Sequence, residues 1–233
     1  MELRQLFDPK SSTYTYLLWD AETREAALID SVREKIERDS TLIRELGVQL
    51  KYLLETHIHA DHITGAGELR KRFSAKVIVH RNSNTDCADI LVEGGERLEL
   101  GSHTIEVLYT PGHTNTDISF LIDGAVFTGD ALLIRGSGRT DFQSGDAGIA
   151  YDSIKEKLFT LADGTLVYPA HDYHGHTVTS IGEEKAFNPR LGNQTTREDY
   201  VKLMNALDLD KPKLIDEAVP GNLACGIQRQ DGE

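Results

Sequence analysis

The stretch His57-Ile58-His59-Ala60-Asp61-His62 constrains this chain more than any other segment, because it places four potential metal ligands within six residues. The run before it, residues 51–56, has the pattern of a short buried strand, and residues 64–73 have that of a helix. Imidazoles and a carboxylate therefore crowd a loop at the carboxyl end of a strand. Their burial is costly unless a cation or a dense hydrogen-bond network satisfies them. The segment predicts a metal site.

The charge balance excludes several classes of partner. The chain has 233 residues, with 25 Lys and Arg against 38 Asp and Glu, a formal net charge of −13. This excess of acid argues against a nucleic-acid partner and against an anionic membrane. No apolar run has the length of a membrane span, and the first residues have neither signal-peptide nor transit-peptide character. We expect a cytoplasmic protein, or a mitochondrial matrix protein if the chain is a processed eukaryotic one.

The two cysteines, Cys87 and Cys225, lie far apart in different contexts. They have no metal-binding spacing and form no disulfide framework. The sequence therefore predicts two reduced thiols, as is usual in a cytosolic protein.

Strand-like and helical patterns alternate in groups along the chain. Residues 32–46 have one apolar helical face and end at Gly47, a typical helix stop. Asp123-Gly124 is a favoured hairpin turn, and Thr195-Thr-Arg-Glu198 has the pattern of a capping box. The predicted strands are 13–20, 25–30, 51–56, 76–80, 104–109, 117–122, 125–128 and 165–168.

This order predicts an α/β fold with two mixed sheets packed face to face and flanked by helices. We expect residues 1–175 to form the domain that carries the metal site. Residues 176–233 are predicted to be a C-terminal extension packed on the same domain.

Four strand-like runs each end in a candidate ligand, namely His57, His113, Asp130 and His171. Strand ends can present side chains from a rigid scaffold to one shared cleft. A single histidine at a strand end is more often a structural residue. Four such endings together with the 57–62 cluster make coincidence improbable.

These residues carry a family resemblance. The motif from Thr56 to His62, followed by His113, Asp130 and His171, resembles that of the metallo-β-lactamase superfamily over about residues 1–175. The resemblance implies an αββα sandwich with the metal site at one edge of its two sheets.

Longer strings resemble the persulfide dioxygenases (sulfur dioxygenases) of that superfamily over nearly the whole chain. The resemblance implies an oxidoreductase that converts glutathione persulfide, O2 and water to sulfite and glutathione. Ser137 departs from the pattern, because several relatives have cysteine there. The strings are Phe127–Arg135, Gly138–Gln143, Tyr168–Gly175, Asn188–Leu191 and Ala218–Gly226.

By motif position, the resemblance implies that His57, His113 and Asp130 hold one Fe(II) per chain. A face of two histidines and one carboxylate leaves three positions on iron open for O2 and a substrate sulfur. Zinc can bind the same residue types. Four further residues are implied to orient ligands and water by hydrogen bonds, although they would also suit a second metal: His59, Asp61, His62 and His171.

Glutathione carries two carboxylates, so its site needs cationic or donor groups. The resemblance favours Arg139, Tyr173 and Arg190 for this role, since arginine pairs with a carboxylate through two hydrogen bonds and tyrosine donates one. Arg135 and Asp141 are weaker candidates, because a salt bridge between loops accounts for them equally well. The expected partners are glutathione persulfide and O2, with no nucleic acid and no membrane, and a homodimer is left open.

The main alternative is a hydroxyacylglutathione hydrolase of the glyoxalase II type, in which a hydroxide bound to two metals attacks a thioester. The strings 139–143 and 171–175 favour the dioxygenase instead. The tail is also shorter than the helical domain of those hydrolases. A non-catalytic iron or persulfide sensor is a third alternative, although nothing in the sequence indicates a partner surface for it.

Overall fold

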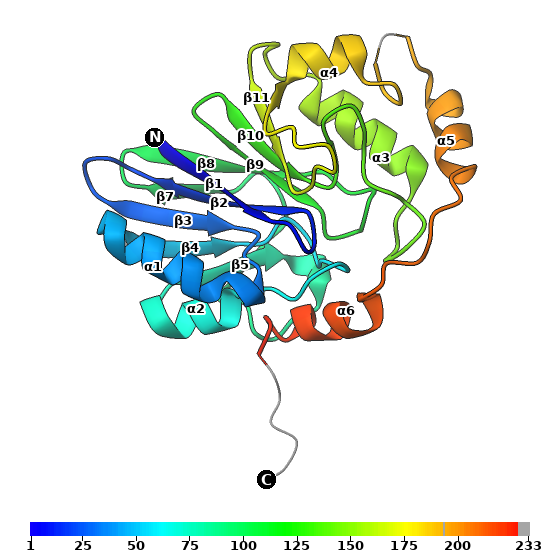
Figure 1. Cartoon of the computed structure of the whole chain (residues 1–233). Coiled ribbons are helices and arrows are strands. Elements are labelled where there is room, and N and C mark those ends of the chain that lie inside the picture. The colour runs from blue at the N-terminus through cyan, green and yellow to red at the C-terminus, as the bar shows by residue number, and fades with distance from the viewer. Residues whose placement is uncertain (193, 228–233) are drawn as a thin grey trace. The chain divides into compact units, whose positions relative to one another are not determined.

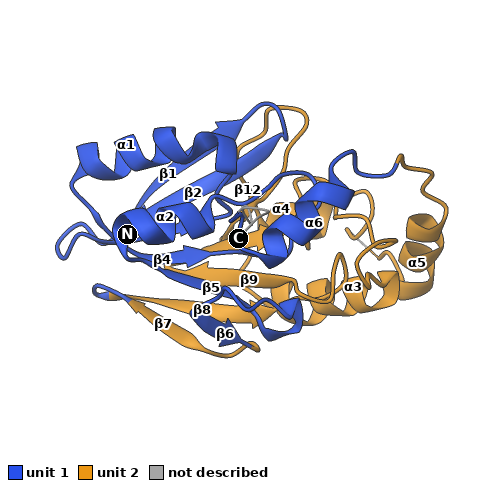
Figure 2. Ribbon diagram, turned by 90° about the horizontal axis from the view of Figure 1, so that it is seen from below, with its two compact units in different colours: residues 1–92, 100–102, 211–233 blue, residues 93–99, 103–210 orange. Residues whose placement is uncertain are grey.

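The computed structural model describes residues 1–192 and 194–227, and the contacts between them divide the chain into two units (Figures 1 and 2). Unit 1 comprises residues 1–92, 100–102 and those from 211 onward, and unit 2 comprises residues 93–99 and 103–210. The tail is thus shared between the units. The predicted domain boundary after residue 175 stays a prediction.

Unit 1 is built on a mixed sheet whose described strands have the order β1-β2-β3-β4-β5-β6. The β1, β2 and β3 neighbours are antiparallel, and the β3 to β6 neighbours are parallel. Helices α1 and α2 cover one face of this sheet (Figure 1). The elements are β1 (Glu2–Asp8), β2 (Thr13–Trp19), β3 (Glu25–Ile29), α1 (Ile36–Leu46), β4 (Gln49–Leu54), α2 (Ala66–Phe73), β5 (Lys76–His80), β6 (Ile90–Val92) and α6 (Ile215–Leu223).

Unit 2 has a second mixed sheet, with the order β12-β11-β10-β9-β8-β7 over its described strands. The β10–β11 pair is parallel, whereas β8 with β9, β9 with β10 and β11 with β12 are antiparallel. The elements are β7 (Arg97–Leu100), β8 (His103–Tyr109), β9 (Ile118–Ile122), β10 (Ala125–Gly129), α3 (Ala147–Ser153), a π-helical turn (Ile154–Leu158), β11 (Leu166–Pro169), β12 (Thr179–Ser180), α4 (Ile181–Phe187) and α5 (Arg197–Asn205).

Helix α1 illustrates how the sequence pattern becomes packing. Its residues Ile36 and Ile43 are buried against the core of unit 1, which also contains Leu28, Leu53 and others. Gly47 then takes a left-handed backbone conformation with φ of 62°, and its N–H donates to the last carbonyls of the helix. The predicted stop at Gly47 is confirmed, because glycine adopts this conformation without a steric penalty.

The predicted turn is also confirmed, whereas the predicted capping box is displaced. Asp123 and Gly124 both have positive φ and join β9 to β10. The cap of α5 is Thr196, which accepts a hydrogen bond from the Asp199 N–H, one residue later than predicted. Two consecutive threonines precede this helix, and the spacing of side chains alone could not show which of them caps it.

The prediction of two reduced thiols is wrong. Cys87 and Cys225 form a disulfide, with their Cα atoms 6.0 Å apart and 138 residues between them in sequence. The expectation rested on cellular compartment and on local spacing, and neither reports which distant segments meet in the fold.

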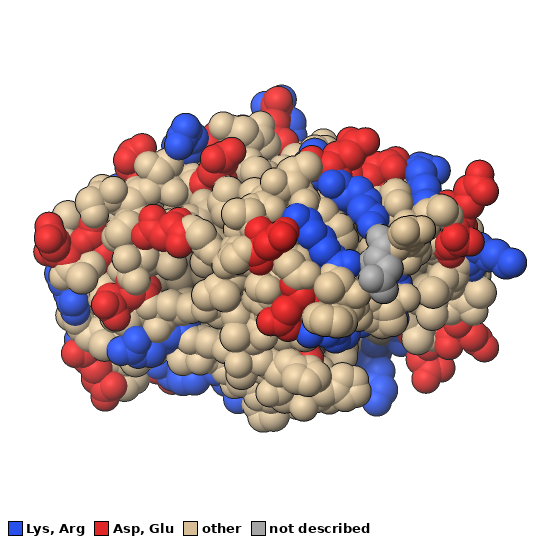
Figure 3. All heavy atoms as spheres, turned by 90° about the horizontal axis from the view of Figure 1, so that it is seen from above, with Lys and Arg blue, Asp and Glu red and all other residues tan. Residues whose placement is uncertain are grey.

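No helix within residues 1–192 or 194–227 is long and apolar enough to cross a membrane. On the face shown in Figure 3, acidic and basic side chains are interspersed. This surface is consistent with the acidic charge balance of the sequence.

We expect Gly47→Ala to destabilise the protein by about 1 kcal/mol, because alanine is disfavoured in a left-handed conformation. A Cβ at Gly47 would have nothing within 4 Å, so the loss would report backbone conformation alone. Gly164→Ala is the matched control, since its Cβ would also lie in open space but its φ is not in the left-handed region. Urea unfolding of both variants measures the difference, and equal stabilities would contradict the assignment.

Candidate metal centre

The residues predicted to bind metal occur in both units. In unit 1, the loop between β4 and α2 carries the four candidate ligands of the segment 57–62. Unit 2 contributes His113, Asp130 and His171 from loops at the ends of its strands.

In unit 1, the buried carboxylate of Asp30 fixes the start of the metal-binding loop. It accepts hydrogen bonds from the Thr56 N–H and the Thr56 hydroxyl, both at 2.8 Å. The Thr56 oxygen lies 2.9 Å from Nδ1 of His57. Because the hydroxyl hydrogen is donated to Asp30, the oxygen can only accept, so Nδ1 of His57 carries the proton. Nε2 of His57 therefore keeps a lone pair for a metal.

His59 has different surroundings, because its ring lies among carboxylates. Its Nε2 is 3.2 Å from an Asp30 oxygen and 3.7 Å from a Glu55 oxygen, and its Nδ1 is 3.9 Å from an Asp61 oxygen. Burial by itself lowers the pKa of His59, but the charge of Asp30 and the other carboxylates raises it to about 10. Burial, aided by the charge of Asp30, raises the pKa of Glu55 to about 8. A protonated imidazole has no lone pair for a metal.

The ring of His62 lies beside Asp61. Its Nδ1 lies 3.0 Å from an oxygen of Asp61, which also accepts a hydrogen bond from the Thr13 hydroxyl. Nε2 of His62, like both ring nitrogens of His59, is buried and has no hydrogen-bond partner among the described residues. The ligand atoms of His59, Asp61 and His62 lie within 4.8 Å of one another.

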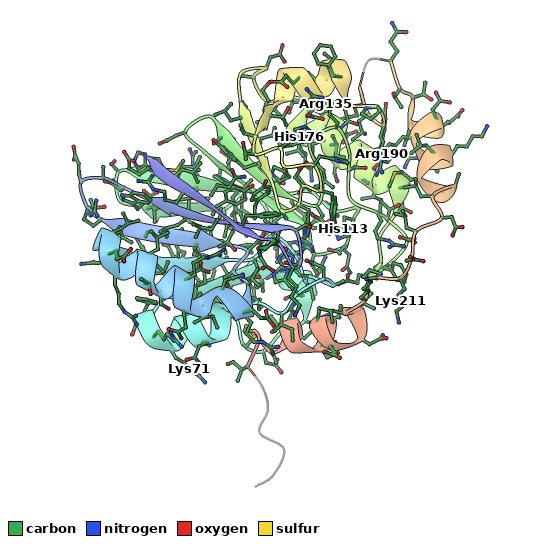
Figure 4. All side chains as sticks on the ribbon, viewed as in Figure 1. Lys71, His113, Arg135, His176, Arg190 and Lys211 are labelled. Carbon is green, nitrogen blue, oxygen red and sulfur yellow. A yellow bond between two sulfur atoms is a disulfide. The ribbon has the colours of Figure 1, made fainter. Side chains whose placement is uncertain are left out.

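In unit 2, a backbone carbonyl determines the orientation of His113. This residue lies in the loop between β8 and β9 (Figure 4), and its Nδ1 donates to the carbonyl oxygen of Arg139 at 2.7 Å. A carbonyl can only accept, so Nε2 of His113 keeps its lone pair. The same loop is held by the buried carboxylate of Asp117, which accepts from the N–H and the hydroxyl of Thr114. Burial raises the pKa of Asp117 to about 6.

Asp130 lies between the two histidines of unit 2. Its Oδ2 is 3.6 Å from Nε2 of His113, and its Oδ1 is 3.7 Å from Nε2 of His171. Gly138 allows this arrangement, because a Cβ there would lie 2.4 Å from the Asp130 carbonyl oxygen and 3.0 Å from the His113 ring. The glycine at position 138 thus has a steric reason.

These donor atoms fit a bound metal ion. Oδ1 of Asp130 is buried and has no hydrogen-bond partner among the described residues. An unpaired buried carboxylate oxygen is costly, and a cation would offset that cost. The distance from Asp130 to Nε2 of His113 is too long for a hydrogen bond and suits ligand atoms that share an ion.

The predicted substrate residues all lie in unit 2. The guanidinium of Arg139 pairs with both oxygens of Asp141, at 2.7 and 2.8 Å, and also reaches the backbone carbonyls of Leu209 and Asp210. Hydrogen bonding to Arg139 lowers the pKa of the Asp141 carboxyl. The candidate Arg139 therefore has a pre-formed acidic partner.

Tyr173 and Arg190 differ in exposure. Tyr173 is 70 % exposed, and its ring is stacked near His171 with 6.1 Å between centroids. Arg190 is labelled in Figure 4 and donates to the carbonyl oxygen of Ser137 at 2.7 Å. Arg135 forms ion pairs with Glu183 and Glu184 of helix α4, so its salt bridges reach a helix and not another loop.

Sequence reasoning missed Asp30, which holds the metal-binding loop. The sequence does contain a pattern that points to Asp30, because this residue directly follows a strand, as the predicted metal ligands do. It also missed Asn222, which donates to the carbonyl oxygens of His59 and His62. No local pattern could reveal that contact across 160 residues or more.

Comparisons with known proteins identify the family of this chain. The model of the metallo-beta-lactamase superfamily matches residues 8–171. A curated relative from Bos taurus, persulfide dioxygenase ETHE1, mitochondrial, is 51 % identical over 97 % of this chain and 89 % of its own length. The crystal structure of ETHE1 from Myxococcus xanthus matches with a TM-score of 0.95 and 53 % identity, covering 97 % of this chain and all of that one.

The chain belongs to the persulfide dioxygenase family of the metallo-beta-lactamase superfamily. The predicted resemblance and the predicted fold class are thereby confirmed. Glyoxylase B2 of Dictyostelium discoideum, at 30 % identity over 93 % of this chain and 88 % of its own length, is a more distant relative.

We expect Thr56→Val to weaken metal binding roughly 10- to 100-fold, because it removes the hydroxyl that links His57 to Asp30. Chelator competition measures the affinity. Thr15→Val is the matched control, since it also removes a buried hydroxyl that bonds to Asp30, but to its backbone carbonyl. Equal metal affinity in the two variants would refute the role of Thr56.

Proposed function

We propose that this chain oxidises glutathione persulfide with O2 and water to sulfite and glutathione at a single Fe(II). The proposal rests on one observation above all: about half of the residues, over nearly the whole chain, are identical to those of proteins named persulfide dioxygenase. The residue chemistry of the two half-sites supports it.

In this proposal, His57, His113 and Asp130 hold the iron. The bound iron supplies the redox chemistry between the persulfide sulfur and O2. The protein presents two imidazole nitrogens that keep their lone pairs, since the Nδ1 proton of each ring is bound elsewhere. The carboxylate of Asp130 adds an oxygen ligand and a negative charge. With these three ligands, a bound iron would have room for both reactants.

Arg139, Tyr173 and Arg190 are proposed to bind the glutathione part of the substrate. Arginine forms charge-assisted hydrogen bonds with carboxylates, and such bonds give both affinity and orientation. A substrate carboxylate that binds Arg139 would replace Asp141, or the two backbone carbonyls, as the acceptor of its hydrogen bonds. The exposed Tyr173 can donate from a ring whose plane is set by His171.

His59, Asp61, His62 and His171 are proposed to orient the ligands and water rather than to bind the single iron. The carboxylates around His59 support this assignment for that residue. The ring nitrogens of His59 and His62 that have no hydrogen-bond partner among the described residues favour a second metal, and therefore the hydrolase alternative.

Metal analysis and an oxygen-electrode assay on anaerobically purified protein test the proposed function. We expect one iron per chain, with O2 consumed and sulfite formed when glutathione persulfide is added. Two metal ions per chain, together with hydrolysis of a glutathione thioester and no O2 uptake, would establish the glyoxalase II alternative instead.

The place and assembly of the enzyme are further parts of the proposal. We place it in the cytoplasm, or in the mitochondrial matrix if it is a processed eukaryotic chain, because the curated relative from Bos taurus is named mitochondrial. A homodimer stays a prediction. Light scattering can test it by measuring the molecular mass in solution.

We expect Asp130→Ala to lower the bound iron at least about tenfold and to abolish O2 consumption, because it removes a charged ligand. Asp163→Ala is the control, since Asp163 is an exposed carboxylate that pairs with Lys185. Normal iron content with normal turnover in Asp130→Ala would exclude Asp130 as a ligand.

We expect Arg139→Ala to raise KM for glutathione persulfide about tenfold, the usual effect of losing one hydrogen bond to a charged group. Iron content should stay normal, because His113 bonds to the backbone of residue 139 and not to its side chain. Asp141→Ala distinguishes substrate binding by Arg139 from its ion pair with Asp141. If the ion pair is the only role of Arg139, then Arg139→Ala and Asp141→Ala will change KM equally. A loss of iron with unchanged KM would contradict the assignment.

A further inference from the structure

We propose that the C-terminal segment of unit 1 clamps the metal-binding loop, with Asn222 as a positioning residue and the Cys87–Cys225 disulfide as its tether. The C-terminal clamp comprises residues 214–227. The inference uses the proposed function only in treating His57 as a metal ligand.

The side chain of Asn222 is matched to the loop. Its amide nitrogen donates to the carbonyl oxygens of His59 and His62, at 2.8 and 2.9 Å, and its oxygen accepts from the Thr64 N–H at 2.8 Å. Asn222 is only 5 % exposed, so these bonds are shielded from water. Two donors and one acceptor on one planar group satisfy three backbone groups of the loop at once.

The backbone of the C-terminal clamp also lies directly on the start of α2. The Gly67 N–H donates to the Cys225 carbonyl oxygen at 2.8 Å. A Cβ on Gly226 would lie 1.9 Å from the Thr64 carbonyl oxygen, so only glycine permits this approach. The C-terminal clamp therefore contacts the loop through Asn222 and the residues after the loop through main chain.

The disulfide attaches this segment to the sheet of unit 1. Cys225 follows Asn222 by three residues and is bonded to Cys87, which lies between β5 and β6. The Thr85 hydroxyl adds a second link by donating to the Leu223 carbonyl oxygen. A bond between the C-terminal clamp and the sheet restricts how far Asn222 can move from the loop.

A thiol can break this tether. Cys87 is half-buried whereas Cys225 is 3 % exposed, so attack occurs at the sulfur of Cys87. Two low-molecular-weight thiols reduce the bond: the first forms a mixed disulfide with Cys87 and releases the Cys225 thiol. The second then releases the Cys87 thiol and leaves as the oxidised disulfide of the reagent. Reduction therefore loosens the C-terminal clamp while Asn222 itself is unchanged.

Hydrogen–deuterium exchange on metal-free, full-length protein tests the C-terminal clamp without any reliance on the reaction. We expect Asn222→Leu to speed exchange of the loop amides, including that of Thr64, at least tenfold. The amides of β4 should keep their protection, which shows that the fold is intact. Asn205→Leu is the control, because Asn205 is an exposed amide at the end of α5. Unchanged loop exchange in Asn222→Leu would overturn the proposal.

Reduction of the unsubstituted protein provides a second measurement that does not depend on a folded variant. We expect a thiol reductant to accelerate loop exchange and the release of iron to a chelator severalfold. Cys87→Ser should show the accelerated rates with or without reductant. The proposal is overturned if reduction leaves loop exchange unchanged, or if both cysteines of the oxidised protein react with an alkylating reagent. An exchange response without any O2 uptake would refute the proposed function and leave the C-terminal clamp intact.

Discussion

The hydrogen bonds between Asp30 and Thr56 are the interaction on which the metal-binding loop of unit 1 depends. A buried carboxylate is costly without donors, and Thr56 supplies two, one from its backbone and one from its hydroxyl. The parallel pairing of β3 with β4 brings the two residues together, because Ile29 is registered with Leu54 and the chain continues in the same direction from both. The sheet topology thus determines which ring nitrogen of His57 keeps its lone pair for a metal.

Much of this arrangement could be predicted from the sequence, because it follows from strand ends. The strands before His57, His113 and Asp130 all appear in the structure, within one or two residues of their predicted bounds. Asp30 follows the same rule and was missed only because a lone aspartate at a strand end is common in proteins without any metal site. Local hydrophobic patterns were sufficient wherever a site residue lies next to the strand that positions it.

Contacts between distant segments could not be predicted in this way. The Cys87–Cys225 disulfide and the bonds of Asn222 to the loop both join residues more than 130 positions apart. A local sequence pattern cannot report either contact. The folding of the long segment between the two residues determines how close they lie in space. The left-handed Gly47 was predictable for the opposite reason, since its conformation is set by the helix directly before it.

The partners of each histidine ring, rather than the number of histidines, determine what the loop can bind. His57 and His113 each donate Nδ1–H to an oxygen that can only accept, so Nε2 of each ring keeps its lone pair. His59 carries the same side chain, but the carboxylates beside it stabilise its protonated form. A cation could use His59 only by displacing that proton against the pull of Asp30. The four candidate ligands of this motif are therefore not equivalent: His59 and His62 both have buried ring nitrogens without a hydrogen-bond partner among the described residues, but only His59 lies beside both Asp30 and Glu55.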